Sequence, residues 1–294
     1  MGSLLPVIPA EIERAADEMP TFSPILGKVE ELSREMNVSP RDLVKVVMLD
    51  PVLTGNVIKL VNSSFYGLGQ KVQSLSQAVL LLGINTVKNL AISTVMISAL
   101  FTRGKGSPIH PEAFWRHCLG TAACCKYLAR ALRIPPDSQE AFFVAGLIHD
   151  IGKILFIKTD PTRYEKALEE SRRLSVSLAF AERSHFGCDH THVGGLLARK
   201  WKLDTPIADV IKGHHEIPEK GKADARALVT ISNNLCKEWT IGDGGNSVIE
   251  EMSADVSDEI GLGPHVLAQA ANLLPEQLNK AEAFLNLFQE GGVS

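Results

Sequence analysis

The sequence lacks the features of a secreted, disulfide-stabilised protein. Its five cysteines are an odd number, and no two of them form a Cys-x-x-Cys pair. Free thiols buried in a protein of the reducing cytoplasm explain this pattern better than disulfides do. The N-terminal segment carries acidic residues and prolines in place of the basic start and long apolar core of a signal peptide. We therefore expect a cytoplasmic protein.

An excess of positive charge and a long apolar run are missing as well. The chain has 30 Lys and Arg against 34 Asp and Glu, which gives a formal net charge of -4 at pH 7. Such a balance does not indicate binding to nucleic acid or to an anionic membrane surface. The most apolar segment, 90–101, is shorter than the roughly 20 residues that span a bilayer. We expect neither nucleic acid nor a membrane as a partner.

Alternating strand patterns and internal repeats are also absent, and the sequence favours helices almost throughout. Ser39 followed by Pro40 can start one helix, and Ser74 and Gly83 can start and end another. The fold class is therefore expected to be all-α. Further helices are expected at 23–37, 85–101, 111–132, 138–156 and 161–173, after Asp50–Pro51, and in the segments DHTHVGGLLARKW, TPIADVIKGHH and ADARALVTISNNLCKEW.

One break divides the helices into two lobes. Residues 102–111 concentrate Gly, Ser, Pro and charge, as is typical of a domain boundary. This predicts an N-terminal helical lobe at 1–104 and a second lobe at 105–294. A glycine-rich loop at 241–248 separates the last helices, but it lacks the strand and the Lys-Ser/Thr of a P-loop. It is not expected to cradle a phosphate.

The second lobe holds most of the nine histidines. In GLIHDIGKILF (146–156), His149 and Asp150 are adjacent, and Lys153 lies one helical step beyond, where it could meet a phosphate. A helical scaffold can bring such residues into one pocket, where imidazole and carboxylate ligands suit one or two ions of Fe, Mn, Zn or Ni. The candidate ligands are His117, His149, Asp150, His190, His214 and His215.

A polar cluster without a metal is the competing interpretation. His149 and Asp150 could satisfy each other through hydrogen bonds in a dry core. His190 and His192 are two residues apart and face different sides of one helix, so we do not expect both to be ligands. Ordinary core or surface positions are expected for His110, His185 and His265.

Six stretches occur in an order that accidental similarity does not explain. They are MPTFSPILGKVEEL (19–32), LDPVLTGNVIKLVNSSFYGL (49–68), QAVLLLGINTVKNLAIS (77–93), GLIHDIGKILF (146–156), DHTHVGGLLARKWKLDTPI (189–207) and KGHHEIP (212–218). The second lobe resembles the HD superfamily of metal-dependent phosphohydrolases, and the first lobe narrows this to the HDOD (HD-related output domain) family. The resemblance covers about residues 18–240. It implies an HD-like helical bundle in the second lobe and a signalling or output role.

The resemblance also implies a metal site that is incomplete at one position. The six candidate ligands and Lys153 match the pattern of the related HD-GYP phosphodiesterases. Asn233 stands where that pattern has a late aspartate, and an amide could bind a metal weakly but brings no charge and cannot act as a base. The Gly-Tyr-Pro motif is missing after His214–His215. Hydrolysis of cyclic-di-GMP is therefore not expected.

The first lobe has its own distinctive segment, NSSFYGLGQKVQS (62–74). The glycines permit a tight turn, and Phe65 and Tyr66 can pack against a neighbouring helix. A structural turn is the main expectation. Asn62 is the polar residue that could instead contact a ligand or a partner.

Three functions are compatible with these patterns. The first is a non-catalytic signalling module that binds a signalling protein partner or a nucleotide-like ligand and retains a metal. The second is a metal-dependent phosphohydrolase acting on a nucleotide or cyclic nucleotide, in which Lys153 would steady the phosphate. The third is a redox or oxygen sensor with a di-iron centre on the same ligands.

Overall fold

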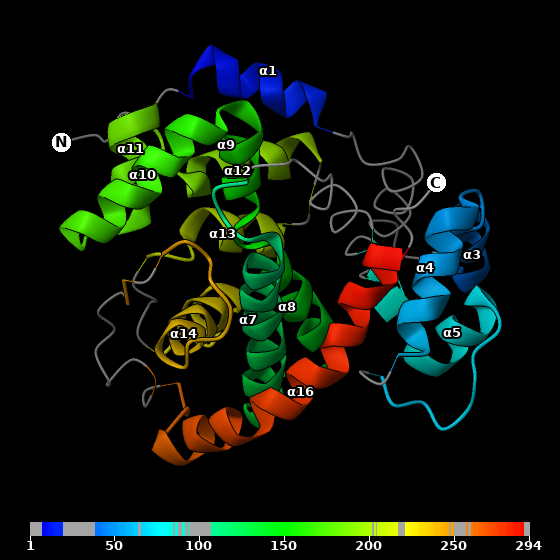
Figure 1. The fold of residues 1–294 in the computed structure, drawn as a ribbon. Helices are drawn as coiled ribbons and strands as arrows, with labels where there is room; N and C mark the ends of the chain where they lie inside the picture. Colours follow the sequence, from blue (N-terminus) through cyan, green and yellow to red (C-terminus); the bar gives the residue numbers. More distant parts are fainter. Residues whose placement is uncertain are drawn as a thin grey trace.

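Every element that this computed structural model describes is a helix, which confirms the all-α expectation (Figure 1). The predicted helix at 23–37 and most of the one at 85–101 lie outside the described residues. The structure describes residues 8–19, 39–63, 66–84, 86–87, 90–91, 94, 107–201, 203, 205–216, 221–246, 248–249, 257 and 260–290.

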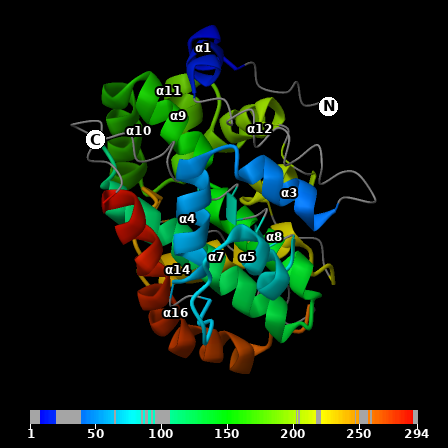
Figure 2. The ribbon, with the colours of Figure 1, turned by 90° about the vertical axis from the view of Figure 1, so that its right-hand side faces the viewer.

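In the described part of the predicted first lobe, three capped helices lie together on the side facing the viewer in Figure 2. The Ser39 hydroxyl accepts a hydrogen bond from the amide of Arg41 at 3.2 Å, and Ser74 accepts one from Gln77 at 3.2 Å. Gly83 ends its helix with φ +84°, which glycine adopts without strain. These caps confirm the predicted ends. The helices are α3 (Pro40–Val47), α4 (Pro51–Val61) and α5 (Leu75–Leu82).

Asn62 has a structural role at the end of α4. Its Oδ1 accepts a hydrogen bond from the Val72 amide at 2.7 Å, and its Nδ2 donates to the Val72 carbonyl at 2.7 Å and the Ile58 carbonyl at 2.9 Å. The amide side chain therefore joins the end of α4 to the segment that precedes α5, as a structural turn requires. A ligand role for Asn62 stays a prediction.

The second lobe is arranged around α7 and α8, which lie side by side at its centre (Figure 1). Helix α14 packs against both, while α9 to α12 form a layer at one end. These helices are α7 (Pro111–Ala131), α8 (Pro136–Ile148), α9 (Ile151–Thr159), α10 (Pro161–Leu174), α11 (Leu178–Phe186), α12 (His190–Lys200), α13 (Thr205–Gly213) and α14 (Ala225–Glu238).

The single helix predicted at 138–156 is wrong, because the chain breaks between α8 and α9 at His149–Asp150. His149 Nδ1 donates to the Gly146 carbonyl at 2.7 Å. In an uninterrupted helix that carbonyl would accept the amide of Asp150. The side chain thus replaces a backbone bond, and the break turns His149 and Asp150 into the interior.

The helices near the two ends of the chain contact helices on the other side of the predicted boundary at residue 104. Helix α1 (Ala10–Glu18) packs on α9 and α12 of the second lobe. Its Glu11 pairs with Arg163 of α10 at 2.7 Å, and its Asp17 pairs with Lys200 of α12. Helix α16 (Pro264–Glu290) contacts both α7 and α4. The two-lobe division stays a prediction. Among the described helices, none has the length and apolar character of a membrane span.

Candidate metal centre

Asp150 lies at the centre of the predicted cluster and is fully buried. Its Oδ2 is 3.3 Å from Nε2 of His149 and 3.8 Å from Nε2 of His117, which comes from α7. Its Oδ1 is 3.4 Å from Nε2 of His190 at the start of α12, and 3.5 Å from Nε2 of His214 just after α13. The two oxygens of one carboxylate therefore face two different groups of histidines.

The structure brings all six predicted ligands together. Within each of two groups, the donor atoms lie within 4.8 Å of one another, a spacing at which they could hold a metal ion. Asp150 belongs to both groups. The first group is His117, His149 and Asp150, and the second is Asp150, His190, His214 and His215.

Hydrogen bonds fix which nitrogen of each ring carries its proton. Nδ1 of His149 faces the Gly146 carbonyl, and Nδ1 of His214 lies 3.2 Å from the Ile211 carbonyl. Nδ1 of His190 lies 2.5 Å from Oε2 of the buried Glu182. Carbonyl and carboxylate oxygens only accept, so each neutral ring carries its proton on Nδ1 and keeps a lone pair on Nε2. Metal-binding histidines are commonly held in this way.

The donor atoms of the second group are spaced closely enough to hold one metal ion. Nε2 of His190 lies 2.8 Å from Nε2 of His215 and 3.4 Å from Nε2 of His214. Nε2 of His190 keeps a lone pair because its proton is on Nδ1, and that lone pair can bind either a metal ion or a proton carried by Nε2 of His215. Ligands bonded at about 2.1 Å to one ion are roughly 3.0–3.4 Å apart in octahedral or tetrahedral sites, so the His190–His214 separation fits and the His190–His215 separation is slightly shorter. Three imidazoles and a carboxylate suit Fe, Mn, Zn or Ni.

The first group differs because a cation already contacts its carboxylate oxygen. Lys153 is buried, and its Nζ lies 2.6 Å from Oδ2 of Asp150 and 2.8 Å from the carbonyl oxygen of Gly244. The ammonium neutralises Asp150 on the side of His117 and His149. A metal ion in the first group would compete with this charge for the same oxygen.

The loop at 241–246 closes the first group from outside. A Cβ atom on Gly244 would lie 2.8 Å from Cδ2 of His117 and 3.3 Å from Oδ2 of Asp150. At Gly242, which has φ +67°, a Cβ would lie 2.3 Å from the His117 amide nitrogen. Only glycine permits this approach. The loop was predicted as a separator between helices, and its role as a cover of the cluster was missed.

Burial and neighbouring charges change the pKa values of the cluster. Burial lowers the pKa of His117 to about 3 and that of His214 to about 3, so both rings are neutral near pH 7. Burial alone would raise the pKa of Asp150, but His149 and Lys153 outweigh it and hold that pKa well below its usual value. His117 and His214 are therefore neutral imidazoles and Asp150 is an ionised carboxylate, the forms that bind metals.

Acid is expected to destabilise the metal-free protein. The pKa values of His117 and His214 are lower in the folded protein than the ordinary 6.5, so the unfolded chain takes up protons first. The stability is complete above pH 6.5 and falls as the pH approaches 3, by about 1.4 kcal/mol per pH unit for each histidine. Denaturant unfolding of chelator-treated protein at several pH values measures the slope. The His117→Gln/His214→Gln variant should lose most of it, and an unchanged slope would contradict the pKa assignment.

His192 and His185 are held by carboxylates outside the two groups. His192 faces Asp189, with Nδ1 2.7 Å from Oδ1, so only one of the pair His190 and His192 points into the cluster. His185 pairs with Glu170 at 2.7 Å. Asn233 is buried on α14, and its Oδ1 has no hydrogen-bond partner within the described part of the chain. That orphaned oxygen is compatible with weak ligation, which stays a prediction.

Glu182 is the positioning residue that sequence reasoning missed. Its Oε2 accepts the backbone amide of His190 at 2.8 Å as well as the ring, and its Oε1 accepts the hydroxyl of Tyr164 at 2.9 Å. The only signal in the sequence is an acidic residue on the otherwise apolar buried face of α11, between Ala181 and Phe186. Its partner is eight residues away, beyond a turn.

Comparison with known proteins identifies the family of this chain. The family model described as the HDOD domain matches residues 19–217. The chain belongs to the HDOD family. The matched region contains all six candidate ligands and Lys153, whereas Asn233 and the covering loop at 241–246 lie beyond it. These HDOD residues thus form the cluster, and the segment that covers it is additional to the matched domain.

Relatives and solved structures agree with the fold. An uncharacterized protein of Treponema pallidum (strain Nichols) is 23% identical over 228 residues, which make up 76% of this chain but 42% of that protein. A crystal structure named as a candidate phosphohydrolase of Shewanella amazonensis SB2B is 20% identical, with a TM-score of 0.67 over 96% of this chain and 97% of that one. A candidate signal transduction protein of Marinobacter aquaeolei VT8 is 21% identical, with a TM-score of 0.72 over 97% of this chain and 62% of that one.

Proposed function

We propose that this HDOD protein is a non-catalytic signalling module built around a single transition-metal ion. The ion would be held by His190, His214, His215 and Oδ1 of Asp150. The observation that carries the proposal is that the two oxygens of Asp150 have different partners. Oδ1 faces His190 and His214, whereas Oδ2 is bound by Lys153. The carboxylate therefore has one oxygen available to a metal, and the lysine supplies the second positive charge.

The same arrangement argues against phosphoester hydrolysis by two metal ions. Such catalysis uses one ion on each side of the reacting phosphate. Here the ammonium of Lys153 takes the place of a second ion beside Oδ2 of Asp150. Lys153 is also held by Gly244, which removes it from the position of a mobile phosphate ligand. These contacts disfavour the di-iron sensor for the same reason.

The residues around the candidate metal ligands hold them in position and cover them. Glu182 holds the ring of His190 in orientation, and the break between α8 and α9 holds Asp150 inside the bundle. Gly244 and the loop around it exclude water from the His117 side. An ion bound by this set would offer a Lewis-acid position to an oxygen atom of a ligand.

We further propose that ligand binding is passed on to a signalling protein partner in the cytoplasm. The Marinobacter structure named as a candidate signal transduction protein supports a signalling role, and that chain is longer than this one. The five cysteines are all buried and free, as suits a reducing compartment. The alternative, a metal-dependent phosphohydrolase, is supported by the name of the Shewanella structure and by the partial exposure of His215.

Metal analysis combined with an activity assay tests the proposal. Protein purified without chelators is expected to contain about one transition-metal ion per chain, as one complete donor set implies. The same sample should not hydrolyse bis(p-nitrophenyl) phosphate or cyclic nucleotides above the rate of a His190→Ala variant. Two ions per chain together with turnover that depends on His190 would establish the hydrolase instead. Protein that takes up no Fe, Mn, Zn or Ni on reconstitution would refute every metal-based function.

A further inference from the structure

A hollow on the surface leads to the second donor group. It lies between α11, α12 and the end of α13, and its volume is about 740 Å³. His215 is among the residues that line it, as is Ile8, just before α1. The volume is in the range of sites for small organic ligands, roughly 300–1,000 Å³. We call it the His215 pocket. Because His215 lines this pocket, a ligand bound there can reach it.

The His215 pocket has more positive charge than its carboxylates neutralise. Three cations line it: Arg183, Arg199 and Lys212. Asp189 is already bound by Arg183, Thr191 and His192, and Glu216 is bound by Arg226 at 2.7 Å. Within the described part of the chain, Arg199 and Lys212 pair with no carboxylate. Two cations are therefore available to a bound anion.

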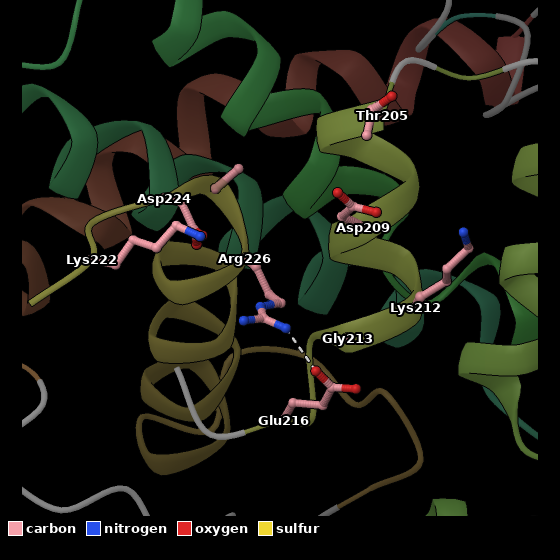
Figure 3. A pocket seen from close by; sticks show the side chains of 9 residues that line it. Thr205, Asp209, Lys212, Gly213, Glu216, Lys222, Asp224 and Arg226 are labelled. Atoms are coloured by element: carbon pink, nitrogen blue, oxygen red, sulfur yellow. Dashed lines mark hydrogen bonds and ion pairs between the residues drawn. The ribbon is translucent and has the colours of Figure 1, made fainter. Parts of the chain in front are cut away.

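Helix packing directs one of these cations into the pocket. Gly195 of α12 also lines the pocket, and a Cβ atom there would lie 2.9 Å from Cγ of Lys212. The side chain of Lys212 thus crosses α12 where α12 has no side chain. Figure 3 shows Lys212 extending from α13 in the direction away from Arg226. The absence of a side chain at Gly195 therefore leaves room for the side chain of Lys212 beside α12.

The neighbouring hollow provides a contrast. It has a volume of about 550 Å³ and shares Lys212 and Glu216 with the His215 pocket (Figure 3). Its two other cations are paired, Lys222 with Asp224 at 3.3 Å and Arg226 with Glu216 at 2.7 Å. That hollow has no free pair of cations for an anion, although its size is similar.

We infer that the His215 pocket binds a small phosphate-bearing molecule through Arg199 and Lys212, with the phosphate beside His215. A guanidinium and an ammonium on adjacent helices match the several oxygens of a phosphate, and charge-assisted bonds of this kind are among the strongest in proteins. The amides at the start of α12 are used by Asp189, so side chains carry the recognition. The inference names the ligand class of the proposed module and rests on that function for its biological role.

Calorimetric titration with inorganic phosphate tests the inference on the whole chain, in metal-loaded and in chelator-treated form. The Arg199→Ala/Lys212→Ala variant is expected to bind phosphate at least about tenfold more weakly, because two charged donors are lost. Its metal content should be unchanged, because neither residue belongs to a donor group. The matched control is Lys222→Ala, which removes a cation from the neighbouring hollow and should change the dissociation constant less than about twofold.

The outcomes separate this inference from the proposed function. Equal phosphate affinity of the double variant and the unmodified protein overturns the pocket assignment, as does an equal loss in the Lys222→Ala control. Phosphate binding that depends on Arg199 and Lys212, in a protein that takes up no Fe, Mn, Zn or Ni on reconstitution, supports the pocket and refutes the metal-based function. Gly195→Leu offers a second check, because it should displace Lys212 and weaken phosphate binding while both cations remain.

Discussion

Replacement of Asp150 by alanine is expected to lower the affinity for transition metal by at least about a hundredfold, since ligand changes exceed the 10- to 100-fold effects of residues around a site. Asp150 is the one residue shared by both donor groups. The same change leaves the ammonium of Lys153 buried without its carboxylate, which costs roughly 3–5 kcal/mol of stability. Metal content by mass spectrometry and denaturant unfolding of the same samples measure both effects.

A second variant separates loss of the ligand from loss of the fold. Asp150→Ala/Lys153→Met removes both charges of the buried pair, and such replacements are often close to neutral in stability. It should recover most of the stability lost in Asp150→Ala while its metal content stays low. A stable double variant with the metal content of the unmodified protein would show that Asp150 is not a ligand.

Much of the fold could be predicted because its signals are local. Ser39, Ser74 and Gly83 act within one turn of their own helices, and the structure confirms all three. The break at His149–Asp150 could not be predicted in the same way. It depends on a side chain that takes a backbone acceptor inside an apolar run, where periodicity continues without interruption. Helices α1 and α11 were missed as well.

The candidate site shows the same limit. The six ligands could be chosen because imidazole and carboxylate side chains in an apolar context have few other uses, and the structure does bring them together. Their division into two unequal groups could not be predicted from the sequence. It depends on the contact between Lys153 and Gly244, which are 91 residues apart. Glu182 was missed for a related reason, since its partner lies on another helix.

Substitution of Gly152 by alanine is expected to destabilise the protein strongly. Gly152 is in the first turn of α9, where an added Cβ would lie 2.0 Å from the carbonyl oxygen of His190 and 2.8 Å from the amide nitrogen of Gly194. These are backbone atoms of α12, which cannot rotate aside as a side chain can. Overpacking of this kind costs about 3 kcal/mol or more. Denaturant unfolding measures the loss.

The position of Gly152 ties this stability effect to the site. Asp150 precedes α9 and His190 begins α12, so forcing the helices apart separates two members of the same donor group. Metal content should therefore fall together with stability. Gly55→Ala is the matched control, because a Cβ there meets nothing within 4 Å in the middle of α4. It should stabilise the protein by about 0.5–1 kcal/mol and leave metal content unchanged. If Gly152→Ala behaved like this control, the close contact of α9 with α12 that places Asp150 beside His190 would be wrong.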